Sequence, residues 1–277
     1  MKKILIIGLV CILIGGLFVG AAYSLGERYI DTNLTSSDVS FTTDDVKNIT
    51  VGDHIAEIRF VKDTGSSGNI TVKAENIIES EYSCSLANGA LDISYSPKSV
   101  KIGIISLPPF MFNFNNINKP SIITVYIPNG KIFDEVYFKG GVGKVEAEQI
   151  NAQSFTAEGG VGAYDIKDMT TGTLNVKVGV GSVKINGVIN GDTKIEGGVG
   201  EVIISGRANG NIKLSAGVGS VILNLTGNVQ DYNIKANKGL GGINLNGKDI
   251  SDSINNNGKY NLDIDAGVGS ININISE

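Results

Sequence analysis

A glycine tripeptide, Gly-Val-Gly, is the first candidate for chemistry in this chain, because glycine-rich turns cradle the phosphates of nucleotides. It begins at five positions 19 residues apart: Gly141, Gly160, Gly179, Gly198 and Gly217. A dinucleotide-binding loop needs a third glycine three residues after the second, and then a helix. Glu146 occupies that position in the first copy, and a strand-like stretch follows. The tripeptide therefore predicts no nucleotide site, and we expect no cofactor.

The longer form Gly-Gly-Val-Gly is similar to the calcium-binding nonapeptide repeats of β-helices, whose sixth residue is the metal ligand. The sixth residue here is Val145, Tyr164 or Val202 in the three copies that carry the full motif. None of these side chains is a calcium ligand, and the period is 19 residues rather than nine. We expect no resident metal, although weak surface binding at Glu146 and Asp165 stays open.

Acid–base chemistry would need acids clustered with a base or a metal on consecutive turns. The repeats contain a single arginine, Arg207, and their acids are scattered or alternate with lysines. The one histidine, His54, precedes the repeats, and Cys84 is expected to be a small buried residue. We therefore expect a protein that is not an enzyme and has no catalytic residues. A polysaccharide-active β-helix enzyme is the least favoured alternative.

Short strands must position these glycines, because each 19-residue block alternates apolar and polar residues, which is typical of a half-buried strand. The fifth residues of the blocks are Val145, Tyr164, Val183, Val202 and Val221. The seventh residues are Ala147, Ile166, Ile185, Ile204 and Leu223. A second alternating run follows a turn in each block. Stacking equivalent strands about 4.8 Å apart would bury both apolar rows. The sequence therefore predicts an all-β fold, a parallel β-solenoid (β-helix) with about 19 residues per turn.

The valine of each tripeptide is expected to point inward and fill a structural corner of the solenoid. These corner residues are Val142, Val161, Val180, Val199 and Val218. The polar rows support stacking, since Glu158, Lys177 and Glu196 would alternate in sign. The same stacking predicts an unfavourable like-charge pair between Glu146 and Asp165.

The N-terminal segment is apolar. Residues 4–26 carry no charge and follow Lys2 and Lys3. This run is long enough to span a bilayer, so residues 1–26 are expected to form a single N-terminal transmembrane helix, with residues 27–277 outside the cytoplasm. A cleaved signal peptide is the alternative, and lipid attachment at Cys11 is a third. The net charge of −5 argues against a nucleic-acid partner.

Residues 27–139 lack the strict period and are expected to form an irregular β region that caps or extends the regular repeats at 140–277. Within this region, Phe110, Phe112 and Phe114 lie close together in the sequence. They either fold onto the body of the protein or form an exposed apolar patch that contacts a partner or the membrane.

The chain ends in an alternating strand, residues 270–275, with no evident cap. An uncovered strand edge can pair with another copy, so end-to-end self-association is a further hypothesis.

The stretch SIITVYIPNGKIFDEVYFKGGVGKVEAEQINAQSFTAEGGVG resembles the core of a bacterial β-strand-repeat family of putative adhesins, otherwise a domain of unknown function. Pro128, Val136, Phe138 and the glycine tripeptides carry the resemblance, which covers about residues 40–277. It implies a non-catalytic cell-envelope protein that adheres, or serves as a scaffold, by binding an envelope protein or a cell-wall or matrix ligand. Some members look like membrane-anchored parts of envelope-stress sensing systems, which gives a second candidate role.

Overall fold

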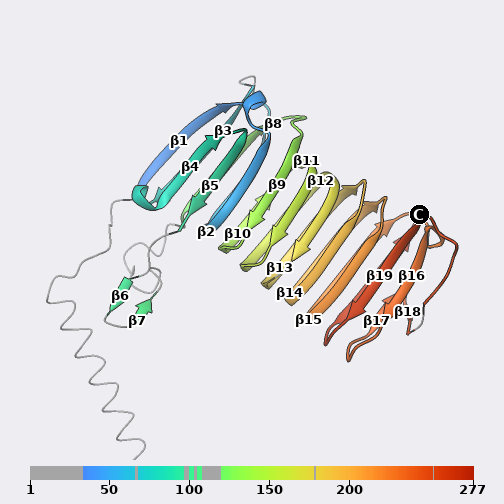
Figure 1. The fold of residues 1–277 in the computed structure, drawn as a ribbon. Coiled ribbons are helices and arrows are strands. Elements are labelled where there is room, and N and C mark those ends of the chain that lie inside the picture. Colours follow the sequence, from blue (N-terminus) through green and yellow to red (C-terminus); the bar gives the residue numbers. More distant parts are fainter. Residues whose placement is uncertain are drawn as a thin grey trace, which may run out of the picture.

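Strands stacked side by side make up almost all of the protein (Figure 1). The computed structural model describes residues 34–65, 68–96, 100–102, 105–107, 120–177, 179–251 and 253–277. The elements before the repeats are β1 (Thr35–Thr42), η1 (Thr43–Asp45), β2 (Asn48–Asp63), β3 (Asn69–Ile77), η2 (Glu79–Glu81), β4 (Tyr82–Ala87), β5 (Ala90–Tyr95), β6 (Val100–Ile102), β7 (Ile105–Leu107), β8 (Ile122–Pro128) and β9 (Phe133–Lys139). Among the described residues, η1, η2 and a third such element in the repeats, η4, are single turns of 3-10 helix.

The repeats form a second series of strands. These elements are β10 (Val142–Ala147), β11 (Ile150–Glu158), β12 (Val161–Lys177), β13 (Val180–Ile189), β14 (Thr193–Ala208), β15 (Ile212–Thr226), η4 (Val229–Asp231), β16 (Tyr232–Asn237), β17 (Ile243–Leu245), β18 (Lys248–Asp249), β19 (Tyr260–Ala266) and β20 (Ser270–Ser276). Parallel pairs join residues 19 apart, so that Val142 lies beside Val161, then Val180, Val199 and Val218.

The strands form two flanks that face each other across the core. Flank A runs β5, β2, β9, β11, β12, β14, β15, β19, β16, and flank B runs β8, β2, β10, β12, β13, β14, β15, β20, β17. β2, β12, β14 and β15 are long enough to serve both. Aromatic rings join the flanks: the ring centroids of Phe60 on flank B and Phe138 on flank A lie 5.2 Å apart. Phe155, also on flank A, packs edge-on against Phe138 at the same centroid distance.

The alternation of the sequence places the core. In β8, Ile123 and Val125 are fully buried, while Thr124 and Tyr126 lie between them on the outer side and are half-buried. Successive side chains of a strand point to opposite faces, so each apolar row turns inward and each polar row faces solvent.

The predicted fold class, a parallel β-solenoid that follows a single transmembrane helix, is wrong in that form. No helix in the described parts of the chain is long and apolar enough to cross a membrane. The proposed anchor at residues 1–26 lies outside the described residues. The first strands also depart from a parallel stack, because β1 pairs antiparallel with β3, β3 with β8, and β4 with β5.

The turn between β4 and β5 explains one of these antiparallel pairs. Asn88 and Gly89 both have positive φ, 51° and 80°, which is the conformation of a two-residue hairpin turn. Such a turn can join only antiparallel strands. The division at residue 139 between an irregular region and regular repeats stays a prediction. The sheet continues across this position, because β2 pairs in parallel with β10, and β9 with β11.

The last strands of the chain do not lie at the end of the stack. β19 and β20 pair with β15 on one side and with β16 and β17 on the other. The final coil is therefore inserted between two coils that precede it in sequence. The uncovered C-terminal strand on which end-to-end association was predicted is an interior strand, so that hypothesis loses its basis.

The true end of the stack is partly covered. β18 folds back as an antiparallel partner of β17, and Ile254 forms an antiparallel bridge with Ile234 of β16. These short segments occupy backbone groups that an open edge would offer to another chain.

The tripeptide valines point outward, so the prediction that they fill an interior corner is wrong. Their side chains are about half exposed, from 46% at Val142 to 54% at Val218. The second glycine of each tripeptide instead lies in close contact with the backbone of the preceding coil. A Cβ on Gly181 would lie 1.9 Å from the Gly162 carbonyl oxygen, and φ of Gly181 is +145°. Alternation counted back from the buried Val145 likewise places Val142, three residues earlier, on the outer side.

Gly181→Ala should therefore destabilise the fold, because the added methyl group would overlap the neighbouring carbonyl and the backbone conformation disfavours a side chain. We expect a loss of several kcal/mol in the free energy of unfolding, comparable with other severe steric changes. The control is Val180→Ser in the adjacent exposed position, which should cost less than about 1 kcal/mol. Urea denaturation of both variants measures the difference. Equal losses would show that the second glycines of the tripeptides do not limit how closely the coils stack.

Ile273 tests the inserted position of β20. Its side chain is fully buried between β15 and β17, so Ile273→Ala should lower the free energy of unfolding by about 2–5 kcal/mol. Asn272→Ala, on the outer side of the same strand, should change it by less than about 0.5 kcal/mol. A frayed terminal strand would instead make both changes small, and urea denaturation separates the two outcomes.

Candidate binding surface

The residues that the sequence singled out outside the repeats are Phe110, Phe112, Phe114, His54 and Cys84. Phe110, Phe112 and Phe114 lie outside the described residues, so their contact with a partner or the membrane stays a prediction. His54 belongs to β2. Cys84 of β4 is half-buried, and burial raises the pKa of its thiol. The thiol therefore stays protonated at neutral pH, which does not favour a reactive nucleophile.

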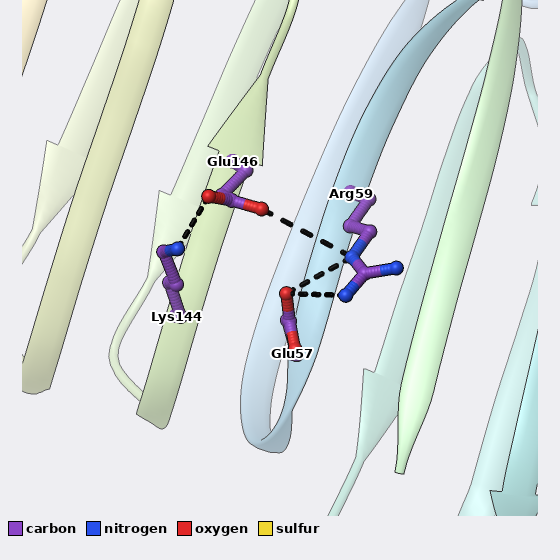
Figure 2. Close-up of polar contacts among 4 residues, drawn as sticks. All are labelled: Glu57, Arg59, Lys144 and Glu146. Atoms are coloured by element: carbon purple, nitrogen blue, oxygen red, sulfur yellow. Dashed lines mark hydrogen bonds and ion pairs between the residues drawn. The ribbon is translucent and has the colours of Figure 1, made fainter. Parts of the chain in front are cut away.

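Four charged residues form a network on flank B, where β2 and β10 run side by side (Figure 2). The Arg59 guanidinium donates to Glu57, with Nη2 2.8 Å from Oε1, and its Nε lies 4.0 Å from Oε2 of Glu146. Lys144 forms an ion pair with Glu146. The Lys144 hydrogen bond, assisted by the charge of Arg59, lowers the pKa of the Glu146 carboxyl.

This network includes Glu146, which with Asp165 was the pair at which weak calcium binding was left open. The two acids are neighbours in register, as the 19-residue stacking predicts. Two cations engage Glu146, and their charge offsets the repulsion between the carboxylates. Within the described residues, no group of three or more His, Cys, Asp or Glu side chains is arranged to hold a metal ion.

A row of polar side chains crosses the outer face of flank A. In spatial order it reads Lys139, Glu158, Lys177, Glu196, Ser215, Asp265 and Asn237. The predicted alternation of charge is therefore present from β9 to β14. Some members are already engaged: the Tyr137 hydroxyl donates to Glu158 at 2.6 Å, and Lys194 pairs with Glu196 at 2.6 Å.

The surface is hollowed towards the C-terminal end of this row. The hollow has a volume of about 620 Å³ and is lined by residues of β12, β14, β15, β16 and β19. Its uncharged lining includes Gly197, Gly198, Ser215 and Gly217, whose small or absent side chains leave space between longer neighbours. Glycine in the tripeptides thus shapes the outer surface as well as the stack.

Charged side chains of both signs surround the hollow: Lys177, Lys213 and Lys235, with Glu196, Asp263 and Asp265. Only Glu196 is paired, and its pKa is lowered chiefly by the hydrogen bond from Lys194. The other five form no ion pair within 4.0 Å among the described residues. The hollow therefore offers three ammonium groups and two carboxylates to a ligand.

Sequence reasoning missed this hollow because it depends on the inserted coil. Asp263 of β19 lies between Lys213 of β15 and Lys235 of β16, although Lys235 precedes it in the chain. The irregular spacing of 28 residues before the last Gly-Val-Gly was a signal of altered order, but spacing alone does not give the new neighbours.

Glu146→Gln tests the charge network on flank B through pH. A depressed carboxyl pKa stabilises the fold above the ordinary glutamate pKa, and the stabilisation is lost as the pH falls through the depressed value. The variant should lose about 0.2–1 kcal/mol of unfolding free energy at pH 7, as expected of a solvent-screened ion pair. The loss should disappear in acid. Urea denaturation across pH measures it, with Glu201→Gln as the control on the same flank. The same pH dependence in both variants would contradict this role.

Comparison with known proteins places this fold in a family. The Toastrack DUF4097 family model matches residues 28–277. A putative adhesin from Bacteroides fragilis is 21% identical over 88% of this chain and 99% of its own, with a TM-score of 0.46. A putative cell adhesion protein from Clostridium sporogenes is 15% identical over 88% and 100%, with a TM-score of 0.37.

A putative lipid binding protein from Parabacteroides distasonis is 14% identical over 88% of this chain and 98% of its own, with a TM-score of 0.35. No curated protein matches the chain. The resemblance suggested by the strand repeats, to a β-strand-repeat family that is a domain of unknown function, is confirmed by the family model. Since the family model covers nearly the whole sequence, the chain belongs to the Toastrack DUF4097 family.

Proposed function

We propose that this protein is a non-catalytic, adhesin-like binding scaffold of the cell envelope. The uncharged run at residues 4–26, after two lysines, supports an envelope location, since export segments share this pattern. The hollow on flank A is the observation that carries the binding role. It combines a concave shape with five charged side chains that form no ion pair among the described residues.

The chemistry of the hollow favours a polar ligand that carries groups of both signs. Its three lysines can bind carboxylates or phosphates, and Asp263 and Asp265 can bind amino groups. The ammonium groups and carboxylates stand on neighbouring strands about 4.8 Å apart, so an extended polymer could meet several of them in succession. A cell-wall or matrix polymer with alternating charge fits this arrangement.

The same features argue for binding rather than catalysis. A general acid or base needs a pKa shifted towards neutral pH by burial or by a like charge. Glu196 is instead stabilised in its charged form by Lys194, and the other five charged side chains of the hollow are exposed. Such groups recognise charge without activating a bond.

Replacing the three lysines tests the proposal. A full-length variant with Lys177→Gln, Lys213→Gln and Lys235→Gln should bind isolated bacterial cell-wall fragments roughly tenfold more weakly, because each lost charge contact costs affinity. Cosedimentation with the fragments at low and high salt measures this, and the binding of the unmodified chain should fall as salt rises.

The matched control replaces Lys167, Lys184 and Lys248 by Gln. These lysines are exposed and lie outside the hollow, so the control changes the net charge equally. Full binding by the control and weak binding by the test variant support a specific site. Equal loss in both would reduce the interaction to net charge, and failure of the unmodified chain to bind would refute the proposal.

A further inference from the structure

A straight line of apolar side chains lies exposed along the stack. It begins with the five outward valines of the tripeptides and continues through Val268 and Leu240. The Val268 amide donates to the Gly217 carbonyl, and the Leu240 amide donates to the Gly267 carbonyl, so each follows the previous one in the stack. In spatial order the valine line is Val142, Val161, Val180, Val199, Val218, Val268 and Leu240.

The valine line is distinct from the rest of the surface. Nine large apolar side chains of the described residues are exposed, and these seven are among them. Exposure rises from 46% at Val142 to 90% at Leu240. The next outward row along flank B instead reads Lys144, Ala163, Ser182, Glu201, Ser220 and Ser270. If strand propensity alone selected valine, branched apolar residues would also fill that row.

The line has a regular geometry fixed by the fold. Strand spacing of about 4.8 Å gives seven side chains a length of about 29 Å. Glycines flank every member on both sides in the chain, so the side chains rise above bare backbone and a partner can approach closely. Ile203 and Ile222 are outward and half-buried on the two strands that carry Val199 and Val218. They add apolar surface near the middle of the line.

From this geometry we infer that the valine line is a lateral docking surface for a second copy of the same chain. A rigid protein partner that contacts all seven positions must present apolar groups at the same strand spacing, and a second copy does so along the whole length. The side chains of the two lines would interdigitate as in a dry interface between stacked strands. A two-fold axis would close the pair and prevent further growth.

The area of the line indicates how strong this contact is. A half-exposed valine presents roughly 30–60 Å² of apolar surface. Seven positions then offer roughly 200–400 Å², below the 800 Å² per partner of a standard stable interface. The pair should therefore be weak and depend on protein concentration.

Site-directed cross-linking of the full chain tests the inference. In a background with Cys11→Ser and Cys84→Ser, Val199→Cys places one thiol at the centre of the line. Val199 faces its own counterpart whether the two lines run parallel or antiparallel. Mild oxidation should yield at least fivefold more disulfide-linked dimer than the control Lys213→Cys on flank A. The control also measures any association through other parts of the chain.

Two further variants give the orientation. Val142→Cys alone should cross-link when the lines run parallel, whereas Val142→Cys mixed with Leu240→Cys should cross-link when they run antiparallel. Adding Val161→Ser, Val180→Ser and Val218→Ser should abolish the Val199→Cys dimer without changing the melting temperature by more than a few degrees, since these side chains are exposed.

Two results would overturn the inference. The first is a dimer yield of Val199→Cys no higher than that of Lys213→Cys. The second is cosedimentation with phosphatidylcholine vesicles that the three serine substitutions abolish, without a specific Val199→Cys dimer. That outcome would assign the valine line to a lipid surface.

Discussion

Close contact between glycine backbones is the constraint on which the stack depends. At the second glycine of each tripeptide, the carbonyl oxygen of the preceding coil leaves no room for a Cβ; the distance from an added Cβ to that oxygen would be 1.8 Å at Gly162 and at Gly200. This column of close contacts accompanies a constant register between successive coils. Val145 and its equivalents enter the core, the tripeptide valines turn outward, and the charged rows align on the flanks.

Much of the architecture could be predicted from the sequence because the repeat is strict where the backbone is constrained. The 19-residue offset gives the partners of Val145, Glu146 and Ala147 without further information. The direction of Val142 could also have been predicted by counting alternation back from Val145. It was missed because an apolar residue between two glycines was taken for a core residue, whereas core position follows from parity along the strand.

The hollow on flank A could not be predicted in the same way. Its lining depends on the insertion of β19 and β20 between β15 and the strands that follow it in sequence. Periodicity describes which residues are equivalent, and it contains no information on the order in which unequal coils stack. Asp263 and Lys235 become neighbours through that order alone. The two surfaces thus differ in origin: the valine line follows from the repeat, and the hollow follows from its interruption.

The inserted final coil has a consequence for how the chain reaches its native state. A solenoid whose coils stack in chain order can add each one as it leaves the ribosome, using mainly local contacts. Here residues 232–245 cannot take their final neighbours until residues 260–276 have been synthesised. The last segment of the chain therefore completes the sheet from within, and an incomplete chain exposes two apolar coil faces that only this segment covers. Folding of residues 232–245 therefore waits for residues 260–276, and its fidelity depends on that later segment.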